Sequence, residues 1–89
     1  MDIQLHHSQN HAKLEVCFEQ LSRMDIVAKS QMFKFYRNIS KKWAEMDKEF
    51  VTCRRSSKLT AIYQKLETEF YESITVFEQW SIMAALMYV

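Results

Sequence analysis

Apolar residues recur every three or four positions along most of this chain, which is the spacing of one face of an α-helix. The strongest pattern lies in residues 56–89, at Leu59, Ile62, Leu66, Phe70, Ile74, Phe77, Trp80 and Met83. A second runs from Met24 to about Cys53, through Ala28, Met32, Phe35, Ile39, Trp43, Met46 and Phe50. Two long helices are therefore predicted.

A shorter pattern precedes them, at Leu14, Cys17, Phe18 and Leu21. It predicts a first helix that begins near Ser8 or Asn10, after a polar, frayed arm over residues 1–9. Two interpretations stay open at Ser22. The Ser22-Arg-Met-Asp25 segment is similar to a capping box, which favours a break and a new helix from Met24. The apolar spacing also permits one uninterrupted helix, and we favour the break.

The best second turn is the polar stretch 54–58, where Ser56 or Ser57 is expected to cap the last helix. The chain has no Gly and no Pro, which disfavours tight β-hairpins. The prediction is an all-α fold over residues 1–89 as a single domain. It consists of an antiparallel hairpin of two long helices plus a shorter N-terminal helix, a three-helix bundle of coiled-coil-like character.

Sorted charges support the antiparallel pairing. Residues 23–42 carry six basic side chains and one acid, Asp25, whereas residues 66–89 carry four Glu and no basic residue. A chain that turns back near residue 55 brings these two blocks together. The expected neighbours are Lys42 with Glu69, Arg37 with Glu72, Lys34 with Glu78, Glu45 with Lys65, Trp43 with Leu66 and Phe70, and Trp80 with Met32.

The composition narrows the possible partners. The net charge of +1 predicts no general attraction to nucleic acid or to an anionic membrane, and the longest apolar run, at residues 82–89, is too short to span a bilayer. Cys17 and Cys53 fall on apolar faces, which is typical of buried free thiols in a reducing compartment. With no signal peptide in the first residues, a cytoplasmic location is expected. Secretion by a route without a signal peptide stays open.

Chemistry-bearing motifs are few. His7 and His11 stand four residues apart, with Glu15 four further on, a spacing that can hold a metal ion on a helix. A solvated polar face is the simpler interpretation. A nucleophilic Cys needs a nearby His, but the three His lie at the far N-terminus and no oxyanion site is marked. A chain without Gly has no phosphate-binding loop. We expect no enzymatic activity and no cofactor.

More apolar residues occur than a two-helix seam can cover, because several lie off the main stripes: Phe33, Tyr36, Tyr63, Tyr71, Val76, Ile82 and Leu86. This favours a protein–protein interaction module, such as an adaptor, a secretion-type chaperone or substrate, or a regulatory subunit. It would bind another protein or a second copy of itself. The predicted contact residues are Phe33, Tyr36, Trp43, Phe70, Phe77, Trp80, Met83 and Met87. The alternative is a DNA- or RNA-binding regulator that uses Lys34, Arg37, Lys41, Lys42, Arg54 and Arg55.

The Trp43-Ala44-Glu45 segment lies mid-chain in a helical protein of about this length. That layout resembles the Trp-Xaa-Gly family of small helical hairpins, whose members are secretion substrates, and Tyr63-x-x-x-Glu67 is similar to its export signal. Glu45 stands where the family has Gly, and Trp43 is expected within a helix rather than at a turn. The resemblance implies a hairpin fold and export as a minor alternative.

Overall fold

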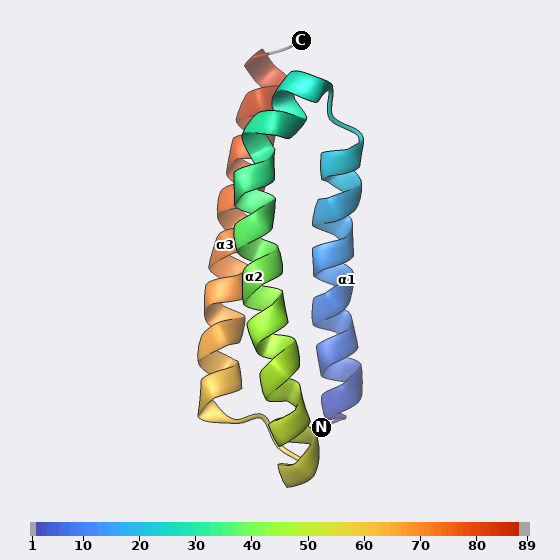
Figure 1. Cartoon of the computed structure of the whole chain (residues 1–89), viewed down its shortest axis with the longest axis vertical. Helices are drawn as coiled ribbons and strands as arrows, with labels where there is room; N and C mark the ends of the chain where they lie inside the picture. The colour runs from blue at the N-terminus through green and yellow to red at the C-terminus, as the bar shows by residue number, and fades with distance from the viewer. Residues whose placement is uncertain (1, 88–89) are drawn as a thin grey trace.

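The computed structural model describes residues 2–87, and the side chains of all of these except Ala85 and Met87. Three helices form a narrow bundle of 49 × 18 × 16 Å: α1 (Ile3–Ser22), α2 (Ile26–Ser56) and α3 (Ala61–Met87) (Figure 1). Helix α2 packs against both neighbours, and more extensively against α3 than against α1. The described residues contain no strand. The predicted all-α architecture, two long antiparallel helices and a shorter first one, is confirmed.

The break between α1 and α2 is also confirmed, but its cap differs from the prediction. Asp25 caps α2, because its carboxylate accepts a hydrogen bond from the Ala28 amide at 2.9 Å. Ser22 instead closes α1, donating its hydroxyl to the Glu19 carbonyl at 2.8 Å. The capping-box interpretation of Ser22 was therefore wrong, although the break that it favoured is present.

The second turn lies slightly later than predicted. Helix α2 ends at Ser56, and Ser57 is its C-cap. The φ of Ser57 is 59°, which is the left-handed conformation that Gly adopts more easily. Thr60, and neither serine, caps α3: its hydroxyl accepts from the Tyr63 amide and donates to Glu49, both at 3.0 Å. The last helix therefore starts at Ala61 rather than near Ser57.

The expectation of a frayed arm over residues 1–9 was wrong for residues 2–9, and Met1 lies outside the described residues. Asp2 caps α1 with its carboxylate, which accepts from the Gln4 and Leu5 amides at 3.0 and 3.2 Å. The helix begins at Ile3, five residues before the earliest predicted start at Ser8. These added turns are held down by packing, since Ile3 is only 8% exposed.

The core follows one heptad-like stripe on each helix. Helix α1 buries six residues at alternating spacings of four and three: Ile3, His7, Asn10, Leu14, Cys17 and Leu21. Tyr63, Phe70 and Phe77 of α3 are completely buried, as are Ile39, Met46 and Cys53 of α2. Phe18 and Ile62, which were assigned to the apolar stripes, are more than half exposed. The buried face of α3 is thus rotated toward Tyr63, which the sequence had placed off the stripe.

The predicted register is confirmed at its centre. The Lys42 ammonium lies 2.9 Å from the Glu69 carboxylate, and the Trp43 and Phe70 ring centroids are 6.0 Å apart. This contact raises the pKa of Lys42 and lowers that of Glu69, chiefly through their shared hydrogen bond. Among the described residues no ion pair joins Arg37 to Glu72, Lys34 to Glu78 or Glu45 to Lys65, so the predicted proximity brings no salt bridge at those three positions.

Within the part of the chain described here, no helix combines the length and apolar character needed to cross a membrane.

Candidate functional site

A buried polar network joins all three helices, and His7 lies at its centre. The imidazole of His7 is stacked between two rings of α2, with centroids 4.3 Å from Trp43 and 4.1 Å from Phe50. Its Nε2 lies 2.8 Å from an Asp47 carboxylate oxygen, and its Nδ1 lies 2.8 Å from the Tyr63 hydroxyl. Because a carboxylate only accepts, Nε2 donates to Asp47, and the Tyr63 hydroxyl, which accepts from the Asn10 amide, donates to Nδ1.

Asn10 extends the network one turn further along α1. Its amide nitrogen donates to the Tyr63 hydroxyl at 3.1 Å and to the Glu67 carboxylate at 2.6 Å. Its carbonyl oxygen accepts from the Tyr71 hydroxyl at 2.5 Å. The Glu67 oxygen also lies 2.5 Å from Nε2 of His6. Asn10 is 1% exposed, and each of its bonds reaches α3.

This arrangement is suited to holding helices together rather than to catalysis. Asp47, His7 and Tyr63 form the acid–base–hydroxyl sequence of a proton relay, but the Tyr63 hydroxyl is sealed in the core with no exposed surface. Burial raises the pKa of Tyr63 to about 12, so the hydroxyl stays protonated at neutral pH. No buried side-chain polar atom of the described residues lacks a hydrogen-bond partner. A fully satisfied network of this kind fixes the register of α1.

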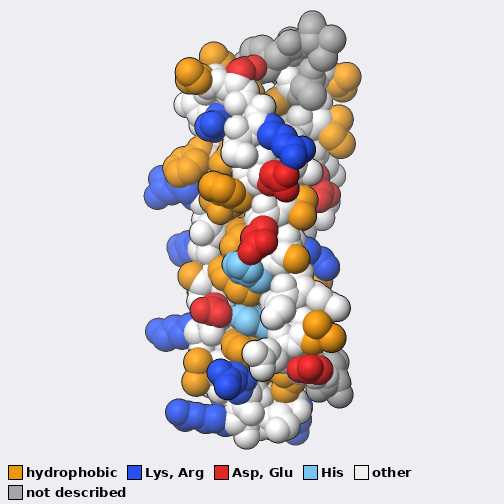
Figure 2. All heavy atoms as spheres, turned by 90° about the vertical axis from the view of Figure 1, so that its right-hand side faces the viewer, with side chains coloured by type: hydrophobic (Ala, Val, Ile, Leu, Met, Phe, Trp, Pro, Cys, Tyr) orange, Lys and Arg blue, Asp and Glu red, His pale blue; other side chains and the backbone are white. Residues whose placement is uncertain are grey.

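The weak metal candidates, His7 and His11, are each engaged by other side chains. Both nitrogens of His7 are engaged as described, and the Nδ1 of His11 lies 2.9 Å from its own helix neighbour Glu15. The described residues contain no group of three His, Cys, Asp or Glu side chains placed to hold a metal ion. The histidine side chains visible on the α1 side in Figure 2 lie beside acidic ones.

The two thiols are buried and unpaired, as the sequence predicted. Burial, with a smaller effect of the Glu78 carboxylate, raises the pKa of Cys17 to about 11. A thiol with such a pKa is almost entirely protonated at pH 7 and is a poor nucleophile.

The predicted partner-binding residues separate into two groups. Phe70 and Phe77 are completely buried, so their assignment to a partner surface was wrong, and Trp43 is occupied by His7 and Phe70 inside the bundle. Tyr36 is partly buried beside Phe18. The side chains that remain about half exposed are Phe33 (49%), Trp80 (47%) and Met83 (48%). The side chain of Met87 lies outside the described residues.

Trp80 and Met83 border a depression between α2 and α3. Its other walls include Met32 and Phe35, and Phe35 stacks on Trp80 with the ring centroids 5.7 Å apart. The predicted proximity of Trp80 to Met32 is thereby confirmed. More apolar side chains are exposed at the same end of the bundle, where α2 begins and α3 ends (Figure 1): Ile26 (86%), Val27 (55%), Ile82 (63%) and Leu86 (75%).

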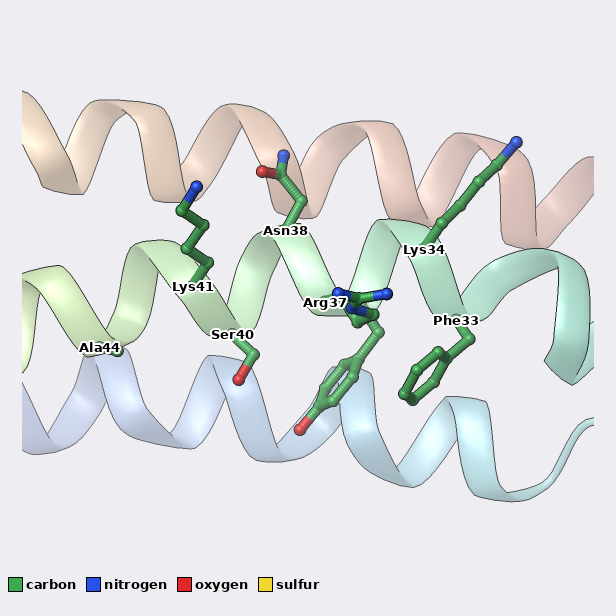
Figure 3. Close-up of a pocket in the computed structure, with 8 residues that line it drawn as sticks. Phe33, Lys34, Arg37, Asn38, Ser40, Lys41 and Ala44 are labelled. Atoms are coloured by element: carbon green, nitrogen blue, oxygen red, sulfur yellow. The ribbon is translucent and has the colours of Figure 1, made fainter.

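The basic residues of the nucleic-acid alternative do not form one set. Lys42 is bound to Glu69, and Arg54 lies over the Phe50 ring at 5.8 Å, near the end of α2. Lys34, Arg37 and Lys41 line a shallow depression on the outward face of α2 with Phe33, Tyr36, Asn38, Ser40 and Ala44 (Figure 3). Within that depression, Phe33 and Ser40 lean toward α1, whereas Lys34, Asn38 and Lys41 lean toward α3.

The sequence-based interpretation missed the polar network because His7 and Asn10 interrupt the apolar pattern. The heptad pattern of the sequence nevertheless indicates that these two residues are buried. Extending the heptad backwards from Leu21, Cys17 and Leu14 places Asn10, His7 and Ile3 on the same face. Asp2, a preferred N-cap residue, stands just before that stretch.

No family model, no curated protein and no solved structure matches this chain. In the structure, Trp43 lies within α2, and Tyr63 and Glu67 belong to the buried network. Those three positions carried the resemblance to the Trp-Xaa-Gly family, and each has a packing role inside the bundle.

Proposed function

We propose that this chain is a non-enzymatic protein–protein interaction module that buries exposed aromatic and Met side chains against a partner or a second copy of itself. The observation that carries the proposal is the apolar end of the bundle, defined by Trp80, Met83, Ile82, Leu86 and Ile26. Each of these side chains is about half exposed or more.

Side chains of this kind are costly to leave in water, and contiguous apolar surface is characteristic of interaction sites. Trp80 stacks on Phe35, and Met83 borders the same depression, so together they form a concave apolar surface instead of isolated exposed residues. Trp is a frequent anchor of protein interfaces, and Met adapts its shape to the partner. The engaged His7, the sealed Tyr63 hydroxyl and the protonated Cys17 provide no reactive group at this surface.

Site-specific photo-crosslinking in the cells that produce the protein tests this proposal. A photoreactive phenylalanine analogue replaces Trp80 or Met83, one at a time. Leu5 and Ile62 serve as matched controls, since both are apolar and more than half exposed but lie at the opposite end of the bundle. Crosslinks from Trp80 and Met83 that are absent from the controls support the proposal, whether the product is a homodimer or a complex with another protein. Equal crosslinking at all four positions, or none at Trp80 and Met83, would overturn it.

The alternative of a different class is a small DNA- or RNA-binding regulator. Its support is the exposure of Lys34, Arg37 and Lys41 along α2, since phosphate backbones are bound by such side chains. Filter binding to mixed-sequence DNA and RNA at low and moderate salt tests it. Binding whose affinity falls steeply with salt supports the alternative, and no binding at low salt excludes it.

A further inference from the structure

The outward face of α2 carries a regular row of basic side chains. Lys34, Lys41, Lys48 and Arg55 follow one another at intervals of seven residues, and Arg37 lies beside them. All five are exposed, and none makes an ion pair with any residue that the structure describes. At a rise of about 1.5 Å per residue the row is roughly 31 Å long. Figure 2 shows Lys and Arg side chains projecting one below another along the left-hand edge of the bundle.

The spacing of this row matches a helical partner. In a straight α-helix, residues seven apart drift by about 20° per interval, so the row winds slowly around α2. A second helix that wraps α2 in a left-handed supercoil follows that drift, and basic residues at one flanking heptad position pair with acidic residues on the partner. The buried residues of α2, Met32, Ile39, Met46 and Cys53, keep the same interval, so the basic row stays at one position relative to the core along the helix.

Apolar and small side chains run beside the basic row, as the seam of such a contact requires. Phe33 is 49% exposed and Val51 is 52% exposed, and Ala44 lies between them along α2. Phe33 and Ala44 line the depression of Figure 3, together with Arg37 and Ser40. Ile26, one heptad before Phe33, is 86% exposed and extends the seam toward the start of α2.

A second copy of the chain offers few carboxylates without a partner of their own to oppose this row. The chain has 11 Asp and Glu residues. All except Glu72 and Glu78 cap a helix or bond to a side chain of their own chain among the described residues. Two dispersed carboxylates cannot match a row of five cations. Because most Asp and Glu side chains pair with groups of their own chain, the outward face of α2 stays basic even though the net charge is only +1.

We propose that the outward face of α2 binds an acidic amphipathic helix of another protein, which lies along the seam from Ile26 to Val51 and pairs its carboxylates with the basic row. This inference rests on the proposed interaction function and adds the chemistry of the partner to it. The row supplies electrostatic steering and register, whereas the apolar seam supplies contact area.

The test uses the full-length protein and a designed peptide probe. The probe is a labelled helix of about 28 residues, four heptads, with Glu at the flanking positions and Leu or Ala at the seam positions. Its control has the same composition in an order that is not amphipathic. Fluorescence anisotropy measures both, together with single-stranded and duplex oligonucleotides, at roughly 50 and 200 mM salt.

Two triple variants show whether probe binding depends on the position of the basic side chains or only on the net charge of the protein. The test variant changes Lys34, Lys41 and Lys48 to Glu, and the control variant changes Lys13, Lys58 and Lys65 to Glu. All six lysines are exposed, and both variants change the net charge equally. Circular dichroism melts confirm that each variant is folded before binding is compared.

The expected result is that the amphipathic probe binds at least about tenfold more tightly than its scrambled control, and that only the variant at positions 34, 41 and 48 loses this binding. Equal binding of both peptides, or equal loss in both variants, would overturn the inference. Tighter binding of an oligonucleotide than of the probe would also overturn it, in favour of the nucleic-acid alternative. If the probe fails while crosslinks from Trp80 and Met83 persist, the acidic-helix inference fails and the proposed interaction function stands.

Discussion

Replacing Tyr63 with Phe removes one oxygen atom from the middle of the bundle and leaves the ring. That oxygen donates to Nδ1 of His7 at 2.8 Å and accepts from the amide of Asn10 at 3.1 Å. Asn10 keeps its bonds to Glu67 and Tyr71, but Nδ1 of His7 is left buried without a donor, because the His7 residue is only 6% exposed. The network therefore loses both hydrogen bonds of that hydroxyl and retains one buried, unsatisfied acceptor.

Leaving a buried polar atom unsatisfied costs about 1–3 kcal/mol. For a domain of this size, a loss of about 2 kcal/mol lowers the melting temperature by roughly 8–16 °C. Urea denaturation followed by far-UV circular dichroism measures the change in the free energy of unfolding. Tyr36→Phe is the matched control, since Tyr36 makes no side-chain hydrogen bond to the described residues and is expected to change stability by less than about 0.5 kcal/mol. Equal effects of the two substitutions, or none for Tyr63→Phe, would refute the role given to the network.

The effect of Tyr63→Phe on stability also depends on pH. The pKa of Tyr63 is raised from 10.0 to about 12 by burial, so between these values the unfolded chain releases a proton that the folded chain keeps. The stability of the wild-type protein therefore falls as pH rises from 10 to 12. Tyr63→Phe lacks this group, so the stability difference between wild type and variant narrows over that range. A difference that stays constant or widens would contradict the burial of the hydroxyl.

Three other substitutions or treatments test separate parts of the fold. Phe70→Ala should lower the free energy of unfolding by roughly 3–5 kcal/mol, because it opens a cavity in the core. Phe33→Ala, at a half-exposed position, should change it by less than about 0.5 kcal/mol. Similar losses in the two variants would show that the core is misassigned. Reversing the charge of Lys42 or of Glu69 alone should lower the melting temperature, and reversing both should restore part of it. A double variant whose loss equals the sum of the two single losses would contradict the register. Cys17 should react with iodoacetamide only in denaturant, and rapid labelling of the native protein would contradict its burial.

The long helices could be predicted because their apolar residues keep a helical period for eight turns or so, and no Gly or Pro interrupts them. The antiparallel pairing could be predicted because the chain sorts its charges into two blocks. Of the four charge pairs proposed, only Lys42 with Glu69 forms. Long exposed side chains gain little from pairing in water, so sorted charge indicates orientation better than individual contacts.

Which residues of each helix are buried could not be predicted, because periodicity does not show what packs against each helix face. Phe70 and Phe77 lie on the same apolar stripe as Trp80, yet the first two are sealed in the core and Trp80 is half exposed. His7 was assigned to a solvated face because polar residues are usually exposed, and Asn10 was considered only as a helix start. Their burial depends on partners that are 40 to 61 residues away in the chain, and no local pattern in the sequence shows such partners.

The buried network holds α1 against the other two helices, and we propose that it leaves the outward face of α2 free for an acidic helix. Two-dimensional amide NMR of the labelled protein, titrated with the designed acidic probe, tests both parts at once. We expect shift changes at the amides of Phe33, Arg37, Lys41 and Lys48, with the amide of Asn10 unmoved and protected from hydrogen exchange throughout. Shift changes centred on α1, or rapid exchange at Asn10 in the free protein, would contradict this expectation.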